Sequence, residues 1–176
     1  MTSLRRSAPP LTRESLDRLA LRYVERFATT RAKLTDYLRR KVRERGWDGP
    51  PADPAEIAAR MADLGYVDDR AFAEARARSM ARRGLGARRV AQAFHAAGIG
   101  AEDADAVAPE IADNAVDAAL ALARRKRIGP FASAAPDRET RERQLAQMVR
   151  GGHDFGLARR IVDMAPGEEI GTFSVE

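Results

Sequence analysis

The residues best suited to chemistry gather in an arginine-rich turn at positions 82–89, which read Arg-Arg-Gly-Leu-Gly-Ala-Arg-Arg. Residues 69–90 hold seven arginines against two carboxylates, a local charge of +5 that equals the formal net charge of the whole chain. Guanidinium groups bind phosphates and carboxylates through paired hydrogen bonds, and free amides at a helix N-terminus attract anions as well. The stretch therefore predicts a surface for an anionic partner, with a helix corner of merely solvated arginines as the alternative.

Helical spacing indicates which arginines could act together. Arg78 and Arg82 lie one turn apart before the glycines, and Arg88 and Arg89 open the helix after them. We expect these four side chains to converge on one side of the corner. The predicted partner-binding set adds two more arginines of this stretch and a pair from an earlier helix. In full it is Arg76, Arg78, Arg82, Arg83, Arg88, Arg89, Arg39 and Arg40.

Patterns that could support catalysis or cofactor binding are weak. His95 and His153 are the only histidines and the chain has no cysteine, so we predict no metal site. The glycines precede no Lys-Ser or Lys-Thr pair of the kind that binds ATP phosphates. Asp68 and Asp69 are adjacent at a helix start and point in different directions, so we interpret both through capping and the helix dipole. We expect no cofactor and no enzymatic activity.

The elements that must position these groups are helices. Thr12, Thr30, Asp53 and Asp68 each stand where a helix begins and can accept a hydrogen bond from its free amides. No segment alternates β-branched and aromatic residues over the length of a strand, so we expect an all-α chain. The residues predicted to face inward include Leu16, Ala20, Tyr23, Phe27, Leu34, Leu38, Ile57, Met61, Leu64, Val90, Phe94, Phe155, Ala158, Ile161 and Val162.

An internal repeat organises these helices. The pattern around Val42 and Gly46 returns 52 residues later at Phe94 and Gly98, and 54 residues after that at Met148 and Gly152. A period of this size predicts stacked helical units that contact mainly their sequence neighbours. The predicted division is a disordered basic N-terminus over residues 1–11, three-helix repeats over 12–65, 66–113 and 114–165, and a flexible tail over 166–176.

Composition narrows the class of protein. A chain of 176 residues without cysteine is long enough to bury a core and fits a reducing, cytoplasmic setting. It has no apolar run of membrane-spanning length and no secretory signal, so we expect neither membrane insertion nor export. The net charge of +5 permits an anionic partner, although heavy use of arginine and alanine is also what a GC-rich genome produces.

The segment after the basic stretch argues against one kind of DNA recognition. Residues 101–117 hold six acidic residues and no basic residue. A helix-turn-helix across 87–110 would place Glu102, Asp103 and Asp105 where a reading helix approaches phosphates, so we do not expect major-groove insertion. The acidic segment either docks a basic protein surface or is a solvated face, and both interpretations stay open.

The middle of the chain contains a block of motifs with a characteristic spacing. Gly65-Tyr66-Val67-Asp68-Asp69 is followed by Phe72-Ala73 and, one helix later, by the arginine–glycine turn. This block resembles the signature of the RecX family, and the resemblance covers roughly residues 12–164. His153-Asp154-Phe155 departs from the plainer glycine–aromatic entry to the last helix that the family often has. The residues that carry the signature, mainly in structural roles, are Gly65, Tyr66, Asp68, Asp69, Phe72, Ala73, Gly84 and Gly86.

The resemblance implies a fold and a function. RecX proteins consist of three tandem three-helix repeats, which implies an elongated array here, straight or curved. They bind the RecA recombinase filament and modulate, mostly inhibit, its ATPase, strand-exchange and coprotease activities in DNA repair, recombination and the SOS response. The arginine set would then contact the RecA filament or DNA, with DNA as the weaker partner, and we expect a monomer. The competing hypothesis is a helical DNA-binding protein that acts without RecA.

Overall fold

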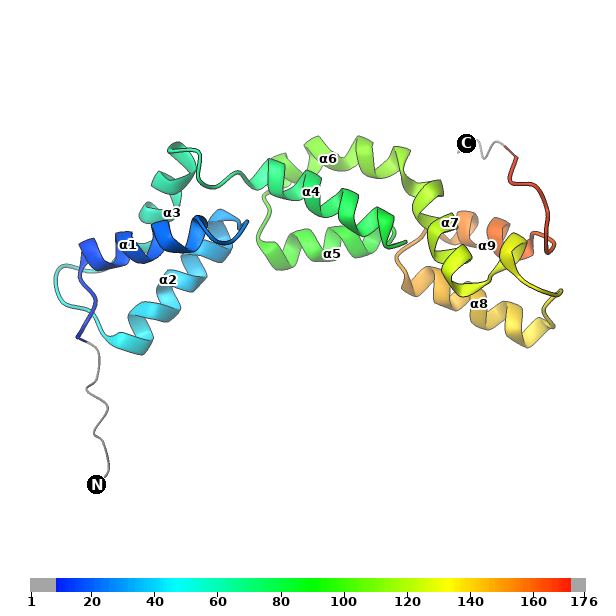
Figure 1. Ribbon diagram of the computed structural model, residues 1–176, viewed down its shortest axis with the longest axis horizontal. Coiled ribbons are helices and arrows are strands. Elements are labelled where there is room, and N and C mark those ends of the chain that lie inside the picture. Colours follow the sequence, from blue (N-terminus) through cyan, green and yellow to red (C-terminus); the bar gives the residue numbers. More distant parts are fainter. Residues whose placement is uncertain (1–8, 172–176) are drawn as a thin grey trace, which may run out of the picture. The chain divides into compact units, whose positions relative to one another are not determined.

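The computed structural model describes residues 9–171, and every regular element within them is helical (Figure 1). The only strand-like feature in that range is an isolated bridge between Leu11 and Trp47. None of the described helices is both long and apolar enough to cross a membrane. The all-α prediction is therefore confirmed. The elements are α1 Arg13–Val24, α2 Arg31–Arg45, α3 Pro54–Asp63, α4 Asp69–Arg82, α5 Ala87–Ala97, α6 Ala101–Asp113, α7 Ala115–Lys126, the short 3-10 helix η1 Gly129–Phe131, α8 Arg138–Arg150 and α9 Phe155–Asp163.

The predicted caps start the helices where the sequence places them. Thr12, Thr30 and Asp53 each accept a hydrogen bond from an amide in the first turn of α1, α2 and α3 respectively. Asp68 Oδ1 accepts one from the amide of Ala71 in α4 at 2.8 Å. Each cap satisfies an amide that has no partner inside its own helix, so these side chains fix where the helices begin.

The glycines that recur in the repeats adopt left-handed backbone conformations and turn the chain at helix ends. Gly46, Gly98 and Gly152 have φ angles of +80°, +66° and +92° and lie close behind α2, α5 and α8. A residue with a Cβ rarely adopts such angles, so glycine is the residue that can leave a helix in this direction. The middle helix of each repeat ends in the same way, and the chain is a tandem array of three-helix repeats.

These repeats group into two compact units. One contains residues 9–72 together with 97–100, and the other contains 73–96 together with 101–171. The division falls inside the predicted second repeat, because the first turn of α4 and the turn between α5 and α6 pack against the first repeat. Each predicted repeat range holds three helices, and the boundaries themselves stay a prediction.

The core of the first unit lies between α1, α2 and α3. Each helix buries one face at helical spacing, as the apolar pattern predicts. Tyr23 and Tyr37 stack at the edge of this core with ring centroids 4.2 Å apart. The buried cluster consists of Leu11, Leu16, Ala20, Leu34, Leu38, Ile57, Ala58, Met61 and Val67.

The predicted disordered N-terminus does not extend to Leu11. This side chain is fully buried, its amide donates to the carbonyl of Gly46 at 2.9 Å, and its carbonyl accepts from the amide of Asp48 at 2.9 Å. A single leucine beside two prolines carries no periodic signal, so the sequence does not distinguish it from the segment before it. Residues 1–8, which are most of the predicted N-terminus, and residues 172–176, which are the last five of the predicted tail, lie outside the described part of the chain.

The second unit buries its own cluster between α7, α8 and α9. The predicted inward-facing residues Ala158, Ile161 and Val162 of α9 are all part of it. Small alanine side chains on α7 let its neighbours approach closely. The cluster consists of Ala119, Leu122, Ala123, Ile128, Met148, Ala158, Ile161 and Val162.

Three predicted inward-facing residues are exposed instead. Phe27 lies past the end of α1, Leu64 is the C-cap of α3, and Phe155 is the first residue of α9. At a helix end the backbone leaves the regular step of about 100° per residue, so a side chain there no longer continues the buried face. In each case the prediction extended the buried helical face to a residue at or beyond the end of the helix.

Asp69 has a tertiary role that the capping interpretation missed. Its carboxylate is buried and accepts two hydrogen bonds from Arg31, one from the backbone amide at 2.9 Å and one from Nε at 3.1 Å. Because Arg31 is the first residue of α2, Asp69 satisfies a free amide of a helix that precedes it by 38 residues. Beside it, the Thr30 hydroxyl donates to the carbonyl of Ala97 at 2.6 Å. Sequence adjacency to Asp68 gave no indication of so distant a partner.

We predict that Asp69→Ala destabilises the protein more than Asp68→Ala. The first change removes the acceptor of the first α2 amide and one acceptor of the Arg31 guanidinium, and it should lower the free energy of unfolding by about 1–3 kcal/mol. The second removes one exposed cap and should lower it by about 1 kcal/mol. Urea unfolding followed by circular dichroism measures both. Equal losses would mean that Asp69 acts only within α4.

Candidate functional site

The arginine-rich turn joins α4 to α5 through Gly84, Leu85 and Gly86. A Cβ on Gly84, whose φ is +72°, would lie 2.6 Å from the backbone nitrogen of Leu122 in α7. A Cβ on Gly86 would lie 2.4 Å from the carbonyl oxygen of Gly152. Neither position has room for a side chain, so the turn is packed against the third repeat instead of standing free.

The backbone amides of this turn already have partners. Gly86 donates to the carbonyl of Gly151 at 2.9 Å, and Arg88 donates to the carbonyl of Gly152 at 3.2 Å. An amide held by a protein carbonyl is not available to a phosphate oxygen. The prediction that free amides at the start of α5 attract an anion is therefore wrong at these two positions.

His153 completes the contact with the turn. His153 is only 2% exposed, and its Nε2 donates a hydrogen bond to the carbonyl of Gly84 at 3.1 Å. Burial lowers the pKa of this imidazole below the ordinary 6.5, and the hydrogen bond to Gly84 opposes that shift only in part. The ring is neutral at pH 7 with its proton on Nε2. In the sequence, its place directly after a repeated glycine is the one signal that points to this contact.

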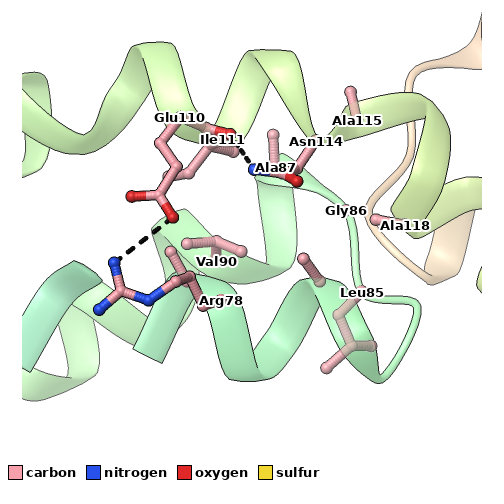
Figure 2. A pocket seen from close by; sticks show the side chains of 12 residues that line it. Arg78, Leu85, Gly86, Ala87, Val90, Glu110, Ile111, Asn114, Ala115 and Ala118 are labelled. Atoms are coloured by element: carbon pink, nitrogen blue, oxygen red, sulfur yellow. Dashed lines mark hydrogen bonds and ion pairs between the residues drawn. The ribbon is translucent and has the colours of Figure 1, made fainter. Parts of the chain in front are cut away.

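Arg78 of α4 reaches across to α6. Its guanidinium lies 3.5 Å from the carboxylate of Glu110 and 3.8 Å from that of Glu74 in its own helix. Figure 2 shows the ion pair between Arg78 and Glu110 among the residues that line a small cavity. The cavity has a volume of about 20 Å³, which has room for about one water molecule. Val90 and Ile111 are among the apolar residues around the cavity. Arg78 therefore holds two helices together, and part of its charge is neutralised.

Arg82 lies with Arg78 along a wider groove between α4 and the α6–α7 segment. The groove has a volume of about 430 Å³, and Glu110, Asn114 and Asp117 also line it. Alanines make up the rest of its surface. Because charges of both signs face it, the groove suits a protein segment with mixed charges better than a row of phosphates.

Arg88 and Arg89 face a different neighbour. A Cβ on Gly152 would lie 2.6 Å from Cγ of Arg89, so the stem of this arginine packs on the glycine, while its guanidinium donates to Gln92 at 3.2 Å. The pKa of Asp154 lies below its ordinary value, first because its carboxylate accepts an amide hydrogen bond and to a smaller extent because Arg88 is near. The four arginines that we expected to converge therefore divide into two pairs, one at the groove and one at the start of α9.

The remaining arginines of the predicted set differ in their surroundings. Arg76 and Arg83 are exposed, and neither has a carboxylate partner among the residues described. Arg39 and Arg40 belong to the first unit, where each pairs with a carboxylate of its own helix, at 3.6 Å and 3.7 Å. As partner-binding residues, all eight stay a prediction.

The chemistry that this arrangement offers is recognition. Within residues 9–171 no three histidine or acidic side chains are grouped so that they could hold a metal ion. Of the two histidines, His153 is buried at the turn and His95 is exposed on α5. Charged side chains on a fixed backbone can bind a partner by charge and shape.

Comparison with known proteins decides the family. Residues 68–107 match the family model described as RecX, second three-helix domain. The chain is 34% identical over 163 residues to the regulatory protein RecX of Myxococcus xanthus, a match that covers 86% of each chain. The chain belongs to the RecX family. The regulatory protein RecX of Agrobacterium fabrum is 29% identical over 153 residues, which cover 85% of this chain and 82% of the relative.

A solved RecX structure has the same fold. The crystal structure of RecX from Lactobacillus salivarius matches with a TM-score of 0.67 at 20% identity, over 85% of this chain and 93% of that one. Agreement at so low an identity concerns the fold and supports tandem three-helix repeats in this RecX chain.

The RecX signature residues mainly shape the backbone. Gly65 leaves α3 at a φ of +78°, Asp68 caps α4, and Ala73 is fully buried. Phe72 is half-buried, whereas Tyr66 is exposed. In this chain Gly65, Asp68 and Ala73 therefore shape the join between the first and second repeats, Gly84 and Gly86 shape the contact with the third, and Tyr66 is an exposed aromatic side chain.

One basic group of this RecX chain lies outside the predicted set. Residues 124–127 read Arg-Arg-Lys-Arg at the end of α7, and all four are exposed. A run of adjacent bases is the sequence signal that marks them. Cations are common at a helix C-terminus because they interact favourably with its dipole, so the run by itself does not separate a functional surface from a structural one.

We predict that Gly86→Ala destabilises the second unit by about 1–3 kcal/mol, because a Cβ 2.4 Å from the Gly152 carbonyl must push two backbone segments apart. The amide hydrogen bond from residue 86 to Gly151 should weaken at the same time. Urea unfolding of the full chain measures the loss. Gly171→Ala serves as the matched control, since nothing lies within 4 Å of a Cβ at that position. A stable Gly86→Ala protein would show that the turn can move away.

We predict that stability falls as the pH is lowered from about 7.5 to about 5.5. The unfolded chain protonates His153 near the ordinary pKa of 6.5, whereas the folded chain does so only at lower pH because the ring is buried. In that window the unfolded state binds more protons, so the stability present above the unfolded pKa is lost on acidification. His153→Gln keeps an amide donor for Gly84 and should flatten the dependence of the melting temperature on pH. His95→Gln, at an exposed site, should leave it unchanged; the reverse pattern would rule out His153 as the cause.

Proposed function

We propose that this RecX chain is a regulatory protein that binds the RecA nucleoprotein filament and mostly inhibits RecA ATPase, strand exchange and coprotease activity, in DNA repair, recombination and SOS control. The observation that carries the proposal is the 34% identity to the regulatory protein RecX of Myxococcus xanthus over 86% of both chains. The match extends over both compact units and is not confined to one motif.

The surfaces of the second unit support a partner made of protein and nucleic acid. The groove at Arg78 and Arg82 presents both signs of charge and suits a protein surface. Arg88, on the first turn of α5, is exposed and suits an anion. Contacts of these kinds, each weak, add up to a useful affinity when several are linked in one chain that lies along a polymer.

The alternative is a DNA-binding protein that acts without RecA. The exposed basic residues that have no carboxylate partner, Arg76 and Arg83 among them, favour it. The two hypotheses differ in what excess DNA does. A protein that only competes for DNA loses its effect when DNA is in large excess, whereas a protein that binds the RecA filament keeps it.

The test is the ATPase activity of RecA on single-stranded DNA, with this protein added below one copy per RecA. We expect inhibition at substoichiometric amounts, since a protein that blocks filament growth acts on many RecA subunits at once. The inhibition should persist when free DNA is raised well above the filament concentration. Inhibition that disappears with added DNA would contradict a RecA-directed function.

We predict that the double variant Arg82→Glu and Arg88→Glu needs at least about tenfold more protein for half-maximal inhibition, which corresponds to a loss of roughly 1.4 kcal/mol of binding free energy. Both side chains are exposed, so each change should alter stability by less than about 0.5 kcal/mol and leave the circular-dichroism spectrum intact.

The matched control for this variant is Arg138→Glu with Arg143→Glu on α8. These arginines are exposed, and each pairs with a glutamate one turn away. The control changes the net charge by the same amount. Equal loss in both variants would mean that only overall charge matters, and no loss in either would place the RecA contact on other residues.

A further inference from the structure

The basic run at the end of α7 is joined to the arginine-rich turn. Arg124, Arg125, Lys126 and Arg127 are consecutive and exposed. Arg125 Nη1 donates to the carbonyl of Arg83 at 2.7 Å, which places the run beside the residue that follows α4. Five basic residues, Arg83 and 124–127, therefore lie together, and we call them the α7 basic cluster.

No carboxylate in the described residues compensates the α7 basic cluster. The guanidinium of Arg124 lies 5.0 Å from the ring centroid of Phe131, and that of Arg125 is bound to a neutral carbonyl. The arginines of α8 and α9 form a contrast within the same unit. Four of them have a carboxylate within 4 Å, namely Arg138, Arg141, Arg143 and Arg159. The side chains of the cluster therefore lack the close carboxylate partners that these four arginines have.

Arg127 stands in a conformation that favours glycine. Its φ of +55° and ψ of +51° make it the one residue other than glycine with a positive φ among those described. An L side chain is strained in this left-handed region, and helices usually place glycine at such a position. The helix dipole favours cations in the last turn of α7 and at its C-cap, but it acts on the charge and does not require the left-handed backbone conformation of Arg127. Arginine at this position is therefore not explained by backbone geometry, which favours glycine.

The surroundings of the α7 basic cluster favour nucleic acid over protein as its ligand. Protein interfaces concentrate binding energy in buried aromatic or aliphatic anchors, whereas nucleic-acid interfaces are polar and strongly positive. The cluster has no exposed large apolar side chain. Those found in the described residues belong to other parts of the chain: Phe27, Leu64, Tyr66, Phe155 and Ile170.

We propose that the α7 basic cluster binds the phosphate backbone of DNA, as a site separate from the groove and from Arg88. Guanidinium and ammonium groups spread around one helix end can each contact a different phosphate without reading a base. The inference deepens the proposed function, on which it rests for the presence of DNA beside the protein. It assigns the DNA contact to residues 124–127 of the third repeat, with Arg83 of the second repeat beside them.

The test uses the full-length protein and a fluorescein-labelled oligonucleotide of mixed sequence, single-stranded in one arm and duplex in the other. The variant is Lys126→Gln with Arg127→Gly. Glycine fits the left-handed position better than arginine does, so this variant should be at least as stable as the parent. For single-stranded DNA we expect the slope of log affinity against log salt to shrink by about 1.4, and the affinity at about 0.1 M salt to fall roughly 25-fold, since each lost contact accounts for about 0.7 of the slope. Duplex DNA should show a slightly larger change, at about 0.9 for each contact.

The matched control removes the same two charges elsewhere, by Arg138→Gln and Arg143→Gln. It should keep the parental slope. A Lys126→Gln, Arg127→Gly protein with unchanged affinity and slope in both arms would overturn the proposal. So would a variant that loses RecA inhibition but keeps its affinity for DNA, because the cluster would then bind protein. If instead the variant loses DNA affinity while the parent proves inactive against RecA, the proposed function fails and the DNA site stands.

Discussion

The close contact between the glycine turn and residues 151–153 is the constraint on which the second unit depends. Two backbone segments approach so nearly that a single added Cβ on Gly86 would lie 2.4 Å from a carbonyl oxygen. Two amides and the His153 ring bind carbonyls across the same contact. These bonds hold the turn, the start of α5 and the start of α9 together, since backbone groups that are removed from water need hydrogen-bond partners. The arginines around the turn take their directions from this backbone.

A similar arrangement secures the middle helix of the first repeat. The first amide of α2 donates to the buried carboxylate of Asp69, and an early amide of α5 donates to the carbonyl of Gly152. In both cases a helix N-terminus, which cannot satisfy its own amides, is completed by the repeat that follows. A repeat detached from its successor would expose these amides. Continuity along the chain is therefore built from backbone groups and not only from apolar contacts.

The backbone arrangement places the charged side chains on two kinds of surface, one with both signs of charge and one with positive charge alone. The groove beside Arg78 contains Glu110 and Asp117, so its arginines are partly balanced. The α7 basic cluster has no such balance among the described residues. In the sequence the two groups are both arginine-rich segments, and only their neighbours in space distinguish them.

The sequence by itself determined the helices, their caps and their threefold recurrence, because caps, helical periodicity and left-handed glycines depend on residues within a few positions of one another. It also carried the RecX signature, since Gly65, Asp68 and Gly84 are required by local backbone geometry. The tertiary structure decided the roles of Asp69, Leu11 and His153, whose partners lie tens of residues away. It also decided that the amides of Gly86 and Arg88 are occupied by carbonyls of the third repeat. Hydrogen bonds and close backbone contacts between residues far apart in the chain produce no periodic pattern in the sequence. They can therefore be recognised only in the folded structure.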